Sequence, residues 1–178
     1  MAVLFCLNIY LFFSLKEKQI QPIIKYKYNA LRLLENAGAN MYGRNLKAYK
    51  KTNIEAELAV ADPHRIIQML YEGLLERLSQ AKGAILRNDF AYKADRIAKA
   101  QGIIYGLENS LDRKADPALY DRMLALYEYM RDRLTTAAVS LETAPIDECI
   151  NLLIPIKQAW DKIPNDVKEE VNSQLVNK

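Results

Sequence analysis

The strongest constraint on the fold is a helical spacing of apolar residues that repeats in four consecutive runs between residues 62 and 163. In each run an apolar side chain returns every three or four positions, which places these side chains on one face of an α-helix. Only six glycines and six prolines occur in the 178 residues, and strong helix formers dominate after residue 40. The sequence therefore predicts an all-α domain without β-strands.

Short polar signals separate the four runs. Asp62-Pro63 and Asp116-Pro117 each combine a carboxylate that caps free amides with a proline that suits the first helical turn. Asn88-Asp89 has the composition of a turn, and Pro155 is expected to kink the last helix. Because the connections are short, we predict an antiparallel up-down four-helix bundle. Its helices are expected over residues 63–87, 90–113, 117–141 and 145–161.

Composition divides the chain into four parts: a leader over 1–40, a short N-terminal cap segment over 41–61, the bundle over 62–163 and a flexible tail over 164–178. Residues 1–15 are nearly all apolar, but a helix needs about 20 such residues to span a bilayer. They also lack the basic start and cleavage site of a secretory signal. Two explanations of the leader stay open: translated sequence upstream of a natural start at Met41, or a membrane tether.

Charge and motif content disfavour several classes of function. The net charge of +3 comes from residues 1–40, and the rest of the chain balances its basic and acidic residues. We therefore expect no nucleic-acid partner. His64 stands alone, and Cys6 and Cys149 belong to no metal-binding motif. No phosphate-binding loop or catalytic motif is present. The sequence thus predicts a non-enzyme without cofactor, metal or small-molecule substrate.

The helical wheels also predict which side chains face water. Trp160 lies on the apolar stripe of the fourth helix and is expected to be at least partly buried. The other residues of this stripe are Ile146, Cys149, Ile150, Leu153 and Ile156. Gly102 and Gly106 are expected to allow close approach of a neighbouring helix. Charged residues of the first two helices are expected to face solvent for the most part: Glu72, Glu76, Arg77, Lys93, Arg96, Lys99 and Glu108.

The third helix has more apolar surface than a bundle core requires. Tyr120, Leu124 and Tyr127 extend its central stripe on one side, and Tyr129 extends it on the other. The central stripe is formed by Leu119, Met123, Leu126, Met130, Leu134 and Ala137. Its apolar arc covers roughly 220° on a helical wheel, whereas a core-facing stripe needs little more than 100°. The excess has two explanations: the face is covered by the N-terminal segment or a second subunit, or it forms a groove for another protein. Tyrosine and methionine, which adapt to a foreign helix, favour the groove.

Five sequence blocks resemble the FliS family of flagellin export chaperones. They occur in the family's order on the predicted helices. The blocks are Met41-Tyr42 with Ala48-Tyr49, ADPHRIIQMLYEGLLERLSQAK at 61–82, KAQGIIYGLENSLD at 99–112, LALYEYMRDRL at 124–134, and Ala159-Trp160. Residues 1–40 have no counterpart.

The resemblance implies a cytoplasmic chaperone that binds the disordered C-terminal region of flagellin, prevents premature polymerisation and helps delivery to the flagellar type III export gate. It also implies that the N-terminal segment folds over the groove when no client is bound. The expected groove residues are Ile103, Leu107, Tyr120, Leu124, Tyr127, Tyr129 and Met130. The expected cap residues are Met41, Tyr42, Leu46 and Tyr49. The alternative is a homodimeric structural or regulatory bundle without a flagellin client.

Overall fold

Four long helices make up most of residues 63–169, the part of the chain that the computed structural model describes. No strand occurs within this part. The leader, the cap segment with its residues Met41, Tyr42, Leu46 and Tyr49, and the end of the tail lie outside the described residues. The helices are α4 (Pro63–Leu86), α5 (Phe90–Asn109), α6 (Pro117–Val139) and α7 (Ala144–Asp161).

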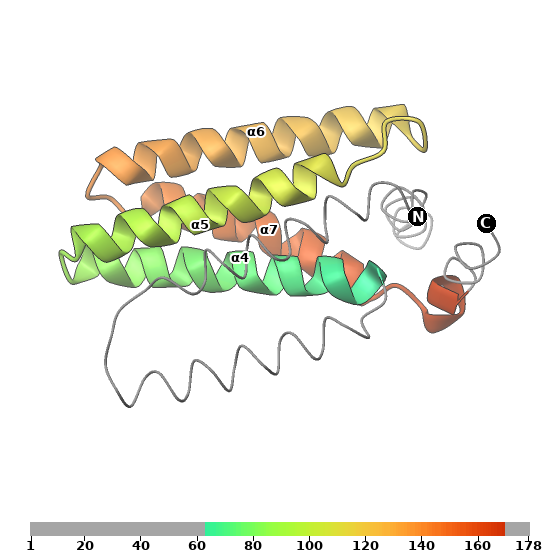
Figure 1. Ribbon diagram of the computed structural model, residues 1–178, viewed down its shortest axis with the longest axis horizontal. Helices are drawn as coiled ribbons and strands as arrows, with labels where there is room; N and C mark the ends of the chain where they lie inside the picture. The colour runs from blue at the N-terminus through green and yellow to red at the C-terminus, as the bar shows by residue number, and fades with distance from the viewer. Residues whose placement is uncertain (1–62, 170–178) are drawn as a thin grey trace.

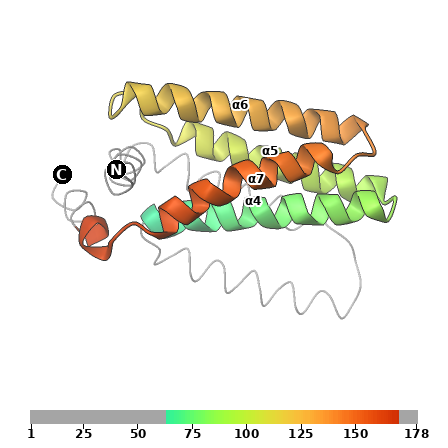
Figure 2. The same cartoon turned by 180° about the vertical axis from the view of Figure 1, so that it is seen from behind.

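The four helices form the predicted antiparallel bundle (Figure 1). Each helix runs opposite to the one before it, and α4 and α6 each pack against both α5 and α7. Seen from behind, α7 lies between α4 and α6, on the side of the bundle opposite α5 (Figure 2). The core therefore lies along the axis enclosed by all four helices. No helix within residues 63–169 is both long and apolar enough to cross a membrane.

The polar signals at Asp89 and Asp116 mark helix starts as expected, whereas the predicted cap residue Asp62 lies outside the described residues. The Asp89 side chain accepts from the backbone N–H of Tyr92, and the Asp116 side chain accepts from that of Leu119. These bonds satisfy amides that have no partner within a helix. Asn88 adopts a left-handed φ of 55° in the turn between α4 and α5, a conformation that asparagine tolerates better than most residues.

The helix ends differ from the predictions at α5. This helix ends at Asn109 and not near Arg113, because the Ser110 hydroxyl donates to the Leu107 carbonyl at 2.6 Å and closes the last turn. The α7 helix continues through Pro155 to Asp161. Ordered structure also extends past the predicted start of the tail, since residues 165–169 are helical.

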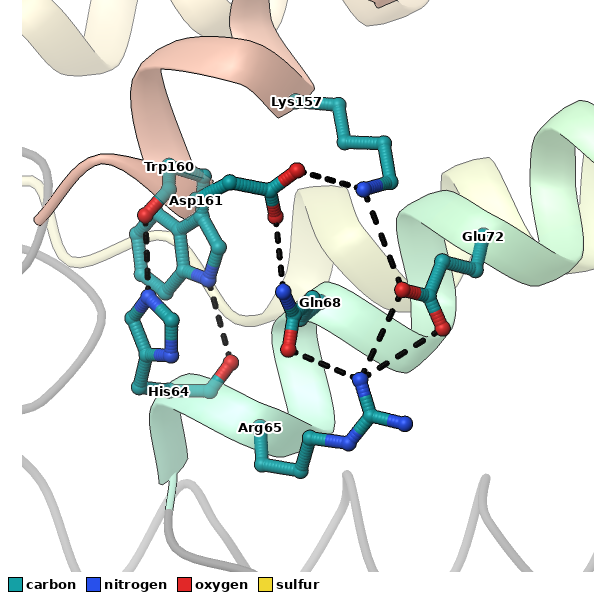
Figure 3. Close-up of polar contacts among 7 residues, drawn as sticks. All are labelled: His64, Arg65, Gln68, Glu72, Lys157, Trp160 and Asp161. Carbon is teal, nitrogen blue, oxygen red and sulfur yellow. Dashed lines mark hydrogen bonds and ion pairs between the residues drawn. The ribbon is translucent and has the colours of Figure 1, made fainter.

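The core contains two buried polar aromatic contacts. The hydroxyls of Tyr71 and Tyr127 lie 3.1 Å apart and join α4 to α6. At one end of the bundle the rings of His64 and Trp160 stack (Figure 3), with centroids 5.1 Å apart. Trp160 is 1% exposed, which confirms its predicted burial. The largest fully buried side chains are Trp160, Tyr71, Tyr127, Leu74, Leu78, Ile97, Ile104, Leu107 and Met130.

Several charged residues that we expected in solvent are buried. Lys93 donates to the carbonyls of Ala137 and Ser140, at 3.3 and 2.9 Å, and so binds the C-terminal end of α6. Cations are favourable at this end of a helix because of its unpaired carbonyls and its dipole. A helical wheel gives the direction of a side chain but not the reach of a long aliphatic stem. The prediction for Lys93 was therefore wrong.

A second group of buried cations lies along α4 and α5. Asp95 accepts from both Arg96 and Lys99. The Gln80 side-chain oxygen accepts from Arg77 at 2.9 Å and from Arg96 at 3.1 Å. Hydrogen-bond acceptors on both helices thus allow the side chains of Arg77, Arg96 and Lys99 to be buried. The helical wheel did not predict this burial.

The close approach expected at Gly102 and Gly106 does not involve another of the described helices. Within the described part of the chain, a Cβ atom at either position would have no heavy atom within 4 Å. These two glycines therefore do not mark a tight crossing of α5 with another described helix.

The free energy of unfolding is expected to fall as the pH rises above 10. Burial raises the pKa of Tyr71 to about 12 and raises that of Tyr127 well above its usual value. Unfolded tyrosines ionise near pH 10, so above this pH the unfolded state loses protons while the folded state keeps them. Above pH 10, each such tyrosine lowers the free energy of unfolding by up to about 1.4 kcal/mol per pH unit. Below pH 10 it has no such effect, because both states keep the proton.

Urea melts at about pH 9 and about pH 11 measure this effect. Tyr71→Phe should show a smaller loss of stability between the two pH values than the unmodified chain, because its position 71 cannot ionise. Equal losses of stability in both proteins would contradict the raised pKa of Tyr71.

Candidate protein-binding surface

The α6 helix has one fully buried stripe and two partly exposed apolar flanks. One flank faces α5, as the ion pair between Arg131 and Glu108 at 3.0 Å shows. The other faces α7, as the bond from Arg133 to Glu148 at 2.6 Å shows. The buried stripe consists of Leu119, Met123, Tyr127, Met130, Leu134 and Ala137.

Three of the predicted groove residues lie inside the core. Leu107, Tyr127 and Met130 are each 0% exposed. Tyr127 was expected at the edge of the stripe, but its hydroxyl is bonded to Tyr71 across the core. Tyr127 and Met130 on α6 and Leu107 on α5 therefore belong to the core of the described bundle.

The other four predicted residues are accessible, but they do not form one cluster. Tyr120 and Leu124 are half-buried one turn apart on α6. They lie eleven and seven residues before Arg131, and so on the flank that faces α5. Ile103 lies near Gly73 of α4, on the other side of α5. Tyr129 is 43% exposed.

An apolar strip runs along the seam between α6 and α7. It is formed by Leu126 and Tyr129 of α6 together with Leu152 and Ile156, which lie at spacings of four and eight from Glu148 on the side of α7 that contacts α6. Tyr129 is exposed, whereas Leu126, Leu152 and Ile156 are partly buried against the core. The contact of Cys149 with the Met130 carbonyl fixes the antiparallel register. One turn forward on α7 therefore corresponds to one turn back on α6, which brings these four side chains onto one seam.

Hydrogen bonds hold Tyr129 in place at one end of this strip. Its hydroxyl donates to one oxygen of Glu148, and Arg133 donates to the other oxygen. The hydrogen bond from Tyr129, followed by the contact with Arg133, lowers the pKa of Glu148. The same hydrogen bond raises the pKa of Tyr129. The ring is thus fixed with one face toward solvent, which reduces the entropy lost when a partner packs on it.

Sequence reasoning omitted three residues of the strip from the candidate site. It assigned Leu126 and Ile156 to core stripes and did not single out Leu152. The available signal was the spacing of Leu152 and Ile156, four residues apart beside the core positions Cys149 and Leu153. A second apolar row next to a core stripe indicates apolar surface beyond the needs of the core.

The described residues contain no group of three or more His, Cys, Asp and Glu side chains that could hold a metal ion. His64 has a structural contact, since its Nε2 lies 2.9 Å from the Trp160 carbonyl oxygen. The surface between α6 and α7 has partly exposed apolar side chains, the ring of Tyr129 and the carboxylate of Glu148, which is held by two hydrogen bonds. This chemistry suits the binding of another polypeptide.

The chain is similar to known proteins over about two thirds of its length. The family model described as "Flagellar protein FliS" matches residues 45–167. The flagellar secretion chaperone FliSB of Pseudomonas aeruginosa is 44% identical over 118 residues, which are 66% of this chain and 94% of that protein. The flagellar secretion chaperone FliS of Vibrio cholerae is 35% identical over 120 residues, 67% of this chain and 88% of its own. The Salmonella typhimurium protein of the same name is 32% identical over 119 residues, 66% and 88% of the two chains.

The matched region includes four of the five sequence blocks in full, and of the first block it includes Ala48-Tyr49. The resemblance found in the sequence is therefore confirmed. The related proteins are named as chaperones and not as enzymes, in agreement with the predicted absence of catalysis. This chain belongs to the FliS family and is a chaperone of flagellar secretion.

Proposed function

We propose that the chain is a cytoplasmic export chaperone that binds the disordered C-terminal region of flagellin. By covering this region it prevents premature polymerisation, and the complex is delivered to the flagellar export gate. The observation that carries the proposal is the strip of Leu126, Tyr129, Leu152 and Ile156, which stays apolar and partly accessible beside a filled core. A client segment that folds into an amphipathic helix can lay its apolar face on such a strip.

The other accessible residues widen the proposed contact surface. Tyr120 and Leu124 offer apolar area on the α5-facing flank of α6, and Ile103 offers it between α4 and α5. A long disordered client can wrap over several separate surfaces of one small domain. Leu107, Tyr127 and Met130 support this surface from beneath.

The proposal extends to the N-terminal cap segment. In the absence of client, Met41, Tyr42, Leu46 and Tyr49 would cover part of the apolar surface, because tyrosine and leucine at spacings of three and four share one helical face. Bound client would take the place of this segment.

Substitution of Tyr129 by serine is expected to weaken client binding with little effect on folding. Loss of a well-ordered aromatic anchor typically lowers affinity by about tenfold or more. Because the side chain is 43% exposed, the loss of folding stability should be below about 1 kcal/mol. Titration of a labelled C-terminal flagellin peptide measures the affinity, and a urea melt of the same variant measures the stability.

Two matched variants make this test specific. Tyr129→Phe keeps the ring and loses only the bond to Glu148, so its affinity should fall much less. Phe90→Ser removes an aromatic side chain of similar exposure, 52%, at the end of the bundle away from the strip, and should bind normally. If the peptide does not bind the unmodified chain, the homodimeric bundle without a flagellin client becomes the better reading.

A further inference from the structure

A pair of buried arginines lies on the seam between α4 and α5, on a different side of the bundle from the strip on α6 and α7 (Figures 1 and 2). Arg77 comes from α4 and Arg96 from α5, and their side chains are 11% and 8% exposed. The side-chain oxygen of Gln80 accepts a hydrogen bond from each of them, at 2.9 and 3.1 Å. The two guanidinium groups are therefore held side by side, although like charges repel.

The acceptors around this pair leave several N–H donors without a partner. The Nε–H groups of both arginines are buried and have no hydrogen-bond partner within the described part of the chain. Arg96 donates through Nη2 to Asp95, whereas the Nη2 of Arg77 also lacks a bond to any described residue. The edge of Arg77 formed by Nε and Nη2 is therefore free. Such an edge can donate to both oxygens of one carboxylate.

The charges around the pair do not balance. Three cations meet two carboxylates, which leaves a net charge of +1: Arg77, Arg96 and Lys99 against Glu76 and Asp95. The two carboxylate side chains are 57% and 37% exposed, so the cluster reaches solvent.

Arg77 is the member of the cluster without a closely bonded carboxylate. The Glu76 oxygen lies 3.6 Å from its Nη1, beyond hydrogen-bond distance. Burial lowers the pKa of Arg77, and the nearby Arg96 lowers it further, against the opposite effect of Glu76. A buried cation of this kind is stabilised by a bound anion that satisfies its free donors.

Apolar surface adjoins the pair on the same seam. Gly73 of α4 lies opposite Ile103 of α5, whose Cδ1 atom would be 3.7 Å from a Cβ atom at position 73. Gly73 precedes Arg77 by one helical turn, and Ile103 follows Lys99 by one turn. The Ile103 side chain is half-buried. It therefore lies about 6 Å, one turn along the helix axis, from the level of the free guanidinium edge.

We propose that Arg77 and Arg96 bind the carboxylate of an acidic side chain on a helical segment of another polypeptide, with an apolar side chain of that segment on Ile103. A carboxylate fits better than a phosphate group, which carries a charge of about −1.5 to −2. Its single charge matches the net charge of the cluster, and its planar shape matches the free edge of Arg77. An acidic and an apolar residue four positions apart on a helix have the required spacing. The inference does not depend on flagellin as the client.

The arginine Nε–H signals in NMR spectra of the isotopically labelled full chain test the inference. The probe is an alanine-rich peptide of about 15 residues with blocked ends, which carries leucine and glutamate four positions apart. It is made in both orders, with leucine first and with glutamate first. With at least one of the two, the signals of Arg77 and Arg96 should shift and saturate, with a dissociation constant on the order of 1 mM. A peptide with glutamine in place of glutamate should bind about tenfold more weakly or less.

Two lysine variants distinguish the free edge from the charge. Arg77→Lys keeps the positive charge but has no planar edge, so the glutamate peptide should bind it about tenfold more weakly. Arg87→Lys, an exposed substitution near the end of α4, should bind the peptide as the unmodified chain does. Circular dichroism checks that both variants fold, and the shifts in the unmodified chain need no variant at all.

Three results would each overturn the inference. The first is the absence of a saturable shift with up to about 10 mM of either glutamate peptide. The second is equal binding of the glutamate and glutamine peptides. The third is a response of the two signals to inorganic phosphate at lower concentrations than to the glutamate peptide, which would make this a phosphate site. Because the probe contains no flagellin sequence, such a failure is separate from the outcome of the flagellin titration with Tyr129→Ser.

Discussion

Tyr127→Ser is expected to lower the free energy of unfolding by about 3–5 kcal/mol, the usual cost of truncating a large buried aromatic side chain. Tyr127 is 0% exposed, and its hydroxyl meets that of Tyr71 at 3.1 Å in the middle of the core. Serine would leave a cavity between α4 and α6 and remove the hydrogen-bond partner of Tyr71. Since small domains have a total stability of only about 5–15 kcal/mol, this variant should be largely destabilised. Urea melts followed by circular dichroism and Trp160 fluorescence measure the loss.

Phenylalanine variants separate the cavity from the hydrogen bond. Tyr127→Phe or Tyr71→Phe alone leaves one buried hydroxyl without its partner and should cost about 1–3 kcal/mol. The double variant removes both hydroxyls and should cost less than the sum of the two single losses. Tyr129→Ser, only two residues away but exposed, should melt close to the unmodified chain. Equal stability of Tyr127→Ser and Tyr129→Ser would contradict the burial of Tyr127.

The contrast between Tyr127 and Tyr129 shows how far a helical wheel can predict a binding site. The period of α6 correctly identified its central positions, such as Met123 and Met130, because helix geometry fixes which residues share a face. The width of the buried sector depends instead on where α5 and α7 lie. The wheel placed Tyr127 at an edge, but the neighbouring helices cover that edge, and Tyr71 contacts it from across the core.

Long charged side chains set a second limit on prediction from sequence. The sequence predicts the position of the Lys93 backbone, whereas the burial of its ammonium depends on carbonyls of Ala137 and Ser140, more than 40 residues away. Such partners become visible only when the register between helices is known. The helix starts at Asp89 and Asp116 were predictable for the opposite reason, since each cap contacts an amide three residues away.

The four accessible candidate residues show the same limit at the level of the site. Their apolar character was evident from the sequence, but their grouping was not. Tyr129 joins Leu152 and Ile156 of α7 only through the antiparallel register of α6 and α7. Ile103 lies on another side of α5, near Gly73. Periodicity assigns residues to a face, and tertiary packing decides which faces meet.

Trp160→Ala is expected to lower the free energy of unfolding by about 3–5 kcal/mol. The indole is 1% exposed and closes one end of the core, where its ring stacks on His64 and meets the edge of Tyr71 at 6.4 Å between centroids. Its Nε1–H donates to the His64 carbonyl at 3.0 Å, and the His64 ring contacts the Trp160 carbonyl at 2.9 Å. Alanine would remove the stacking and the indole hydrogen bond, which join the first turn of α4 to the last turn of α7 (Figure 3).

Two controls distinguish this buried contact from the polar surface around it. Trp160→Phe keeps an aromatic ring and loses the indole N–H, so its loss of stability should be smaller than that of Trp160→Ala. Asp161→Asn weakens the exposed contacts of Asp161 with Gln68 and Lys157 (Figure 3), and exposed ion pairs of this kind typically contribute below about 1 kcal/mol. Because the alanine variant has no tryptophan, the melts are followed by far-ultraviolet circular dichroism. A loss for Asp161→Asn as large as that for Trp160→Ala would show that the surface contacts, and not the buried indole, hold α4 and α7 together at this end of the bundle.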